Sequence, residues 1–325
     1  MPTIFVTRRV PEAGLDMLRD EFGPENVTVY PHDRSMPHDE LLRDVKGADA
    51  ILCAGDRIGA DVMDAAGDQL KIVATYSVGY NHIDVPAATQ RRIAVTNTPH
   101  ILTETTADLA WALLMDVARR ISEADRYVRE KKWTGWAPDM LLGTDVYGKT
   151  LGIFGMGPIG QAVARRAIGF DMPVLYTDPV TLAPEKENEL NAAAVDKAAL
   201  LTRADFLSIH CALTPETRHA FGPDEFKAMK PSACLINASR GPVVDEAALA
   251  HALQSGQILA AGLDVFEDEP EIHPDLFRCE NVVLVPHIGS ASADTRRKMA
   301  EMDAQNIIAR LKGKKPPNCL NPEVL

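Results

Sequence analysis

The sequence lacks the features that mark disulfide-rich, zinc-binding and membrane-spanning proteins. Its five cysteines are scattered over 325 residues without a CxxC pair, which argues against a disulfide framework and a structural zinc site. No uncharged apolar run approaches the roughly 18 residues that a spanning helix needs. The start "MPTIFVTRRVPE" lacks the basic and apolar regions of a signal peptide. We therefore expect a cytoplasmic protein without a metal site.

Positive charge is also in short supply. Against 46 acidic residues stand 34 Lys and Arg, giving a net charge of −12. This balance argues against nucleic acid or a membrane surface as the main partner. It does not exclude an anionic substrate, because the local field of a site can oppose the net charge. Three cysteines, Cys53, Cys211 and Cys234, lie in apolar runs and are expected to be buried small hydrophobes.

Internal repeats and low-complexity segments are absent, and short apolar runs instead alternate with helical patterns. Such alternation predicts parallel sheets covered on both faces by helices. A first set of predicted strands comprises 3–7, 26–30, 48–54, 71–77 and 93–98. A second set comprises 149–154, 173–178, 204–212, 233–239, 259–266 and 281–287. We therefore predict an α/β fold of two Rossmann-like or flavodoxin-like parallel-sheet domains with a cleft between them.

Two longer helical patterns flank the second set of strands. Residues 103–130 carry an apolar stripe and a capping-box spacing at Thr105 and Asp108, which predicts one long helix leading from one domain to the other. A final helix at about 293–312 has a stripe of its own and no matching strand. We expect it to fold back onto the first domain.

A glycine motif follows the first strand of the second set. "LGIFGMGPIGQAVARRAIGF" places Gly155, Gly157 and Gly160 between an apolar strand and a helix, with Pro158 and Ile159 at the helix start. Gly155 would permit the tight turn, and Gly157 would let the backbone approach a pyrophosphate. Gly160 would let the helix lie close to the strand, while the helix N-terminus offers free amides to the phosphates.

An acid ends the next strand. Asp178 stands 23 residues after Gly155, where a carboxylate can accept hydrogen bonds from an adenosine ribose and would repel a 2′-phosphate. The first basic residue after it is Lys186. The sequence therefore predicts NAD(H) in preference to NADP(H). Without the glycine motif, Asp178 would read as a surface turn residue.

Polar residues also end three later strands. Arg240 follows one of them, at the edge of the sheet where ligands bind, and its planar fork suits a carboxylate. The next strand leads into a group of acids that includes Asp264 and Glu269, and the last into His287, whose ring can exchange protons near neutrality. Each taken alone would fit a surface ion pair, a solvated loop or a packed histidine. Together, downstream of a dinucleotide turn, they form a coherent acid–base and anion site.

With these residues in place, the sequence resembles the NAD(P)-dependent D-2-hydroxyacid dehydrogenase family, and most closely its glyoxylate/hydroxypyruvate reductase branch. The resemblance covers nearly the whole chain. Among the segments that carry it are "YSVGYNHIDV", "TPHILTETTADLAWALL", "GKTLGIFGMGPIGQAVARRA", "SIHCALTPETRH", "MKPSACLINASRGPVVDEAAL", "AAGLDVFEDEP" and "NVVLVPHIGSAS". The family implies reduction of a small 2-oxo acid, glyoxylate or hydroxypyruvate, to the 2-hydroxy acid.

The resemblance implies roles for individual residues. Arg240 would hold the substrate carboxylate and polarise its carbonyl. His287 would donate the proton, and Glu269 would pair with it. The backbone of Val78 and Gly79 would cradle the carboxylate.

The resemblance also implies a set of cofactor contacts. Thr106 would lie near the nicotinamide and phosphates, and Asp264 would bind the carboxamide. The adenine and nicotinamide surroundings would further include His210, Cys211, Pro215, Thr217, Ala238, Ser239, Gly289 and Ser290. Reductases of this branch often carry Arg after the second strand and prefer NADPH, whereas this chain has Asp178.

The family implies a domain arrangement and an assembly. Residues 1–98 with 291–325 would form a substrate-binding domain and residues 99–290 the NAD-binding domain, with hinges near 98–102 and 288–292 that close the cleft. Family members are usually homodimers through the NAD-binding domains. Trp136 would then be an interface residue, with or without a place at the second copy's active site.

Two other functions stay open at this point. One is a dehydrogenase of a larger D-2-hydroxy acid. The other is a non-enzymatic, NAD-binding interaction module, because transcriptional co-repressors share this fold. Turnover of 2-oxo acids with NADH separates the enzymes from the interaction module.

Overall fold

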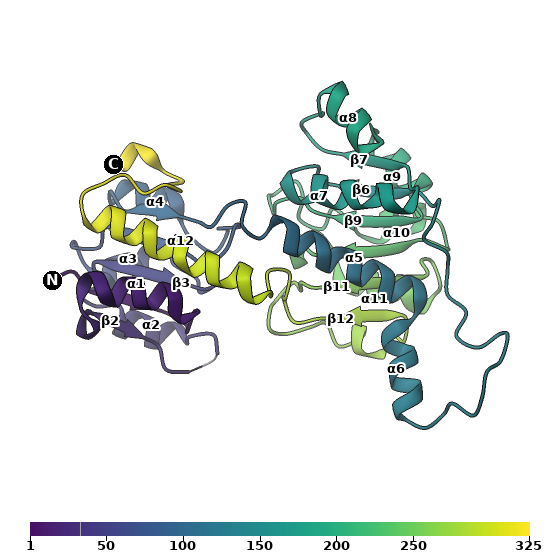
Figure 1. The fold of residues 1–325 in the computed structure, drawn as a ribbon, viewed down its shortest axis with the longest axis horizontal. Coiled ribbons are helices and arrows are strands. Elements are labelled where there is room, and N and C mark those ends of the chain that lie inside the picture. The colour runs from purple at the N-terminus through teal and green to yellow at the C-terminus, as the bar shows by residue number, and fades with distance from the viewer. Residues whose placement is uncertain (33) are drawn as a thin grey trace. The chain divides into compact units, whose positions relative to one another are not determined.

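The computed structural model describes residues 1–32 and 34–325. The chain divides into two compact units, which we call the first unit (Met1–Leu102 with Ser290–Leu325) and the second unit (Thr103–Gly289). Each unit is built on one sheet of parallel strands (Figure 1). The predicted α/β class with two parallel sheets is therefore confirmed.

The first unit contains a five-stranded sheet in the order β2-β1-β3-β4-β5. Its strands are short and almost wholly buried, because helices cover both faces. One face packs against α1 and α12 and the other against α2, α3 and α4. The strands are β1 (Ile4–Val6), β2 (Val27–Val29), β3 (Ala50–Cys53), β4 (Ile72–Thr75) and β5 (Ala94–Thr96). The helices are α1 (Glu12–Phe22), α2 (His38–Asp44), α3 (Ala60–Ala66), α4 (Val85–Gln90) and α12 (Ala293–Leu311).

The second unit contains a seven-stranded sheet in the order β12-β11-β10-β9-β6-β7-β8. The order reverses between β6 and β9, which is the switch point where α/β sheets bind ligands. Helices α5 and α7 cover one face, and α9, α10 and α11 the other. The strands are β6 (Leu151–Phe154), β7 (Val174–Thr177), β8 (Ala192–Ala194), β9 (Phe206–Ile209), β10 (Cys234–Asn237), β11 (Ala260–Leu263) and β12 (Val282–Leu284). The helices are α5 (Thr103–Arg119), α6 (Ile121–Arg129), α7 (Pro158–Ala167), α8 (Pro184–Leu190), α9 (Lys197–Arg203), α10 (Pro223–Ala228) and α11 (Glu246–Gln254).

Short 3-10 turns complete the secondary structure. They comprise Pro24–Asn26, Ile168–Phe170, Gly241–Val243, Leu276–Arg278 and Pro322–Val324.

The long helix predicted over residues 103–130 is interrupted. Arg120 adopts a left-handed conformation with φ of 54°, which separates α5 from α6. Asp116 stabilises the break, since its carboxylate accepts hydrogen bonds from the backbone N–H and the hydroxyl of Ser122. The four-residue apolar spacing on which the prediction of one long helix depended ends at Ile121. This residue is 53% exposed, so the apolar stripe does not continue into α6. Because α5 starts at Thr103, Thr105 lies inside the first turn and not at the cap.

A buried acid in α12 was not foreseen from the sequence. Asp303 is fully buried, and neither of its carboxylate oxygens has a hydrogen-bond partner among the described residues. Burial raises the pKa of Asp303 well above its usual range, since a charge without a partner is unfavourable away from water.

The described residues contain neither a membrane-spanning helix nor a metal-binding group. Across residues 1–32 and 34–325, no helix combines the length and the apolarity that crossing a membrane requires. In the same part of the chain, His, Cys, Asp and Glu form no group of three or more that could hold a metal ion. The five cysteines are free thiols.

Candidate active site

The predicted site residues of the second unit gather at one edge of its sheet. All of them except Thr106 follow the carboxyl ends of β6, β7, β9, β10, β11 and β12. Because all these strands are parallel, the ends face the same way. Thr106 lies in the first turn of α5, is buried, and donates its hydroxyl to the carbonyl of Gly289 at 3.2 Å.

The three glycines after β6 differ in the space that surrounds them. Gly155 has φ of 99°, and a Cβ there would collide with the backbone of Cys211. A Cβ on Gly160 would collide with the carbonyl oxygen of Gly155. A Cβ on Gly157, in contrast, would meet no atom of the described residues within 4 Å. The open space over Gly157, at the N-terminus of α7, fits the pyrophosphate of a dinucleotide.

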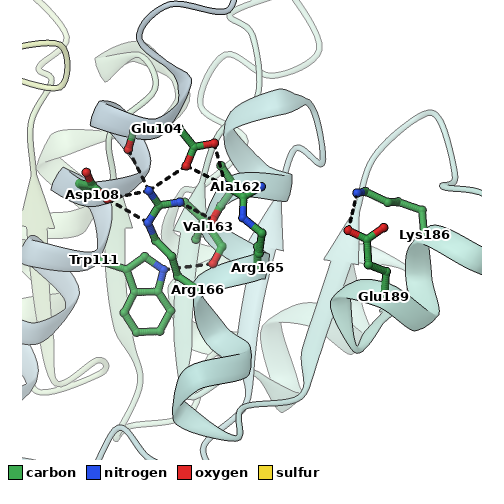
Figure 2. Close-up of polar contacts among 9 residues, drawn as sticks. All are labelled: Glu104, Asp108, Trp111, Ala162, Val163, Arg165, Arg166, Lys186 and Glu189. Carbon is green, nitrogen blue, oxygen red and sulfur yellow. Dashed lines mark hydrogen bonds and ion pairs between the residues drawn. The ribbon is translucent and has the colours of Figure 1, made fainter. Parts of the chain in front are cut away.

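Helix α7, which would present its N-terminus to the phosphates, is fixed to α5 (Figure 2). The indole of Trp111 donates a buried hydrogen bond of 3.0 Å to the carbonyl of Val163. Around it, Arg166 pairs with Asp108 at 2.6 Å, and Arg165 pairs with Glu104 at 2.7 Å. The exposed ion pairs contribute little on their own, so the buried indole is the stronger tie between the two helices.

Asp178 holds the glycine loop, and its predicted contact with a ribose remains a prediction. Its Oδ2 accepts the N–H of Met156 at 2.7 Å, and its Oδ1 accepts the N–H of Val180 at 2.8 Å. Carboxylate oxygens have further lone pairs for a ribose hydroxyl. Lys186, the first Lys or Arg after Asp178 in the sequence, forms an ion pair with Glu189 at 2.8 Å (Figure 2).

The segment after β9 is uncharged where its residues His210 and Cys211 lie against Gly155 of the glycine loop. His210 shares a 2.7 Å hydrogen bond with Ser208, and burial lowers its pKa to about 4. Burial likewise raises the pKa of Cys211 to about 11. Further along, Pro215 is exposed, and the hydroxyl of Thr217 donates to the carbonyl of Ala212 at 2.7 Å. The neutral imidazole and thiol suit the adenine surroundings that the sequence predicts.

Glu269 and His287 form a direct pair. His287 Nδ1 lies 2.7 Å from Oε2 of Glu269, while Oε1 of Glu269 accepts the N–H of Phe266 at 3.0 Å. His287 has φ of 51° and donates its backbone N–H to the carbonyl of Asp264. Its side chain is 50% exposed, so a small molecule can reach the ring.

Arg240 and Glu269 influence the pKa of each other. Burial pushes the pKa of Glu269 upward, but the hydrogen bond and charge of His287, with the charge of Arg240, lower it below its usual value overall. Burial lowers the pKa of Arg240, and the charge of Glu269 opposes that shift. The three side chains are therefore near enough to interact electrostatically, and the carboxylate of Glu269 stays ionised beside the guanidinium of Arg240.

Asp264 organises the turn that follows His287. Its side chain is buried, and its two oxygens accept the N–H groups of Ile288 and Gly289 at 2.6 and 2.8 Å. Burial raises the pKa of Asp264, against the lowering effect of these donors. The carboxylate of Asp264 thus stabilises the turn by accepting its backbone N–H groups. Its contact with a carboxamide remains a prediction.

The turn after β10 is shaped by a residue that the sequence did not single out. Asn237 accepts both the N–H and the hydroxyl of Ser239 and donates to the carbonyl of Arg240 at 3.1 Å. Ala238 and Ser239 are consequently buried in this turn. The sequence did contain a signal for this role, namely an Asn at the end of an apolar strand. A buried amide needs hydrogen-bond partners, and the following turn supplies them.

Val78 and Gly79 lie in the first unit, on the loop after β4. Side chains hold both carbonyls of this loop: Asn97 donates to Val78 at 2.8 Å, and Ser77 donates to Gly79 at 2.6 Å. Ser290 is the first residue of the C-terminal segment of the same unit. The predicted roles of these residues remain predictions.

Comparison with known proteins identifies the family to which this chain belongs. A family model described as "D-isomer specific 2-hydroxyacid dehydrogenase, NAD binding domain" matches residues 111–289. A glyoxylate reductase of Thermococcus gammatolerans is 49% identical over 329 residues, covering 100% of this chain and 97% of that protein. The chain belongs to the D-isomer specific 2-hydroxyacid dehydrogenase family. The predicted family and the oxidoreductase class are thus confirmed.

Other members of this dehydrogenase family give the same result. A glyoxylate reductase of Korarchaeum cryptofilum is 51% identical over 328 residues, covering 100% of this chain and 97% of that protein. The crystal structure of an NADPH-dependent glyoxylate/hydroxypyruvate reductase from Sinorhizobium meliloti, in complex with NADP and malonate, matches with a TM-score of 0.84 at 33% identity, covering 99% of this chain and 97% of that one. An NAD(P)-binding second unit is therefore established, without a choice between the two cofactors.

Proposed function

We propose that this protein reduces glyoxylate to the 2-hydroxy acid with NADH. The observation that carries the proposal is the 2.7 Å pair of Glu269 and His287, electrostatically coupled to Arg240, on the sheet edge that also presents the glycine loop. Anion capture and proton transfer are the two functions that reduction of a 2-oxo acid requires from a protein. NADH, when bound, supplies the hydride to the carbonyl carbon.

His287 donates the proton to the carbonyl oxygen. A carboxylate only accepts hydrogen bonds, so the pairing with Glu269 puts a proton on Nδ1 of the ring. Nε2 is then the ring atom that gives its proton to the developing alkoxide. In the reverse direction the same nitrogen removes the proton from the hydroxyl of the 2-hydroxy acid.

Arg240 holds the substrate carboxylate. Its guanidinium presents a planar set of donors that matches a carboxylate and stays charged even where burial lowers its pKa. The backbone N–H groups of Val78 and Gly79, in the first unit, are proposed as further donors to a substrate carboxylate. Support for this role comes from the loop itself, whose carbonyls are occupied by Asn97 and Ser77.

NADH is preferred over NADPH because of Asp178. A 2′-phosphate would meet the carboxylate of Asp178 and would find Lys186 engaged with Glu189. Gly157, the N-terminus of α7 and Thr106 hold the phosphates, and the remaining predicted contacts surround the two rings. The second unit is accordingly the NAD-binding domain and the first unit the substrate-binding domain.

Glyoxylate is the proposed substrate, with hydroxypyruvate as a second one. Relatives at 49% and 51% identity over the full chain are glyoxylate reductases, and the Sinorhizobium enzyme is a glyoxylate/hydroxypyruvate reductase. A larger D-2-hydroxy acid is the alternative, and a substrate panel decides between them.

A homodimer through the second unit is part of the proposal. Every residue of α6 is at least partly exposed, and Trp136, in the segment that follows α6, is 81% exposed. A groove of about 540 Å³ with mixed polar and apolar walls lies between α5, α6 and the edge strand β12, lined in part by Leu113, Arg126 and Phe277. A second copy would cover these surfaces, and light scattering of the purified protein measures its mass.

The experiment is a spectrophotometric assay. The protein is mixed with NADH or NADPH and a panel of 2-oxo acids, and loss of the nicotinamide absorbance is followed. We expect turnover of glyoxylate with NADH, less with NADPH, and smaller rates for bulkier acids. No turnover across the panel would contradict the enzyme and favour an interaction module.

A further inference from the structure

The loop that carries Glu269 is held by an acid from another element. Glu246 is the first residue of α11 and is 4% exposed. Its Oε1 accepts the N–H of Glu267 at 2.6 Å, and its Oε2 accepts the N–H of His273 at 2.9 Å. One carboxylate therefore binds the loop on both sides of Glu269.

The contact is reciprocal. Glu267 Oε2 accepts the backbone N–H of Glu246 at 3.3 Å, and its Oε1 pairs with Nε2 of His219. Each glutamate thus satisfies the backbone of the other. His219 in turn fixes the side chain of Glu267 from the segment after β9. The loop is anchored at Glu267 by two side chains from two different parts of the chain.

The same loop packs closely on the segment that carries Arg240. A Cβ on Gly241 would overlap the backbone carbonyl of Phe266, so the two backbones approach as only a glycine permits. Phe266 also donates its N–H to Oε1 of Glu269. The anion anchor and the carboxylate partner of His287 therefore stand on backbones that touch each other.

We propose that Glu246 is a positioning residue for the reaction, holding the loop so that Glu269 stays against His287. It contacts neither substrate nor cofactor in this scheme, and acts through Glu269. A buried carboxylate suits this task because it accepts hydrogen bonds at both oxygens, whereas a glutamine offers one acceptor and one donor. The inference rests on the proposed function only where a reaction rate is used as the readout.

The first test is Glu246→Gln, which keeps the shape and leaves one loop N–H facing an amide N–H. We expect kcat for glyoxylate to fall by about tenfold to a hundredfold, since small displacements of catalytic groups have effects of this size. The Kd for NADH should stay at the wild-type value. Asp245→Asn is the matched control, because it removes the neighbouring charge, and Asn caps α11 as Asp245 does; its kcat should match wild type.

A double-mutant comparison separates positioning from general damage. If Glu246 acts through Glu269, then Glu246→Gln should lower kcat little further when Glu269 is already Gln. An equal loss in both backgrounds would overturn the inference, as would a wild-type kcat in Glu246→Gln or a parallel loss of NADH affinity.

A readout without turnover keeps this inference distinct from the proposed function. In protein labelled with ¹⁵N-histidine, the ring signal of His287 is assigned by its loss in His287→Gln. Glu246→Gln and Glu269→Gln should change that signal alike, and Asp245→Asn should not.

His219→Gln, at a half-exposed position, is a second variant that tests the inference if Glu246→Gln does not fold. It should produce a smaller change of the His287 ring signal. A wild-type ring signal in every folded variant of Glu246 and His219 overturns the inference. Absence of turnover by wild type contradicts only the proposed function.

Discussion

His287 Nδ1 lies 2.7 Å from Oε2 of Glu269, although the two residues are 18 positions apart in the chain. They meet because Glu269 follows β11 and His287 follows β12, and these two strands are parallel neighbours. A proton-donating ring and its carboxylate partner are thus brought together by strand pairing. This relationship motivates the first prediction.

His287→Gln should lower kcat by about a hundredfold to ten-thousandfold, which is the usual contribution of a general acid. Its Kd for NADH, measured by fluorescence titration, should change little. A matched control is His38→Gln, since His38 pairs with Asp61 at the same 2.7 Å on the surface of the first unit. A near-normal rate in His287→Gln would refute the acid role.

Replacing Asp178 with Ser should relax the preference for NADH. The ratio of kcat/KM with NADH to that with NADPH should fall about tenfold or more, because a charge-assisted hydrogen bond worth roughly 1.5–3 kcal/mol is lost and repulsion of the 2′-phosphate ends. The freed N–H groups of Met156 and Val180 should weaken the binding of both cofactors and leave this ratio unchanged. Asp196→Ser is the control, since Ser also caps α9. Unchanged discrimination would mean that Asp178 is not the selector.

The three glycines of the loop should respond differently to alanine. Gly157→Ala should keep the wild-type Tm but weaken NADH binding, because its Cβ would enter space that the described residues leave open. Gly160→Ala should lower the Tm, since its Cβ would collide with the carbonyl of Gly155. Thermal unfolding and NADH titration of both variants measure this. Equal losses of Tm in the two variants would contradict a phosphate site over Gly157.

Asp303 should make the protein less stable as pH rises. Its folded-state pKa is raised by burial, so above the unfolded-state pKa the folded form holds a proton that the unfolded form has lost. Up to its raised folded-state pKa, the contribution of Asp303 to stability falls by up to about 1.4 kcal/mol per pH unit.

Asp303→Asn should remove this dependence. The difference in free energy of unfolding between variant and wild type, from urea titrations at several pH values, should grow in favour of the variant from acid toward neutral pH. Asp294→Asn, on the exposed first turn of the same helix, is the control. A difference that is constant with pH would show that Asp303 ionises equally in both states.

Much of the fold was predictable because its signals are local. The β4 run 71–77 and the β12 run 281–287 are apolar and bounded by polar or proline residues, so their period and length indicate strands. β8, three alanines at Ala192–Ala194, has no β-branched residue and was missed. The break at Arg120 was missed because it depends on a side-chain contact between Asp116 and Ser122, which periodicity does not contain.

By itself, the sequence determined the α/β class, the dinucleotide turn and the family, since these depend on residue type and spacing along the chain. Residue chemistry alone did not distinguish the acids after β11, and the pairing of Glu269 with His287 was implied only by the family resemblance. Tertiary structure decided that Asp264 binds the turn after His287 and that Glu267 pairs with His219, and it shows the contact of Glu269 with His287. Neighbouring residues on a loop point in different directions, and their partners come from other strands, so residue type and spacing do not assign each carboxylate its contact.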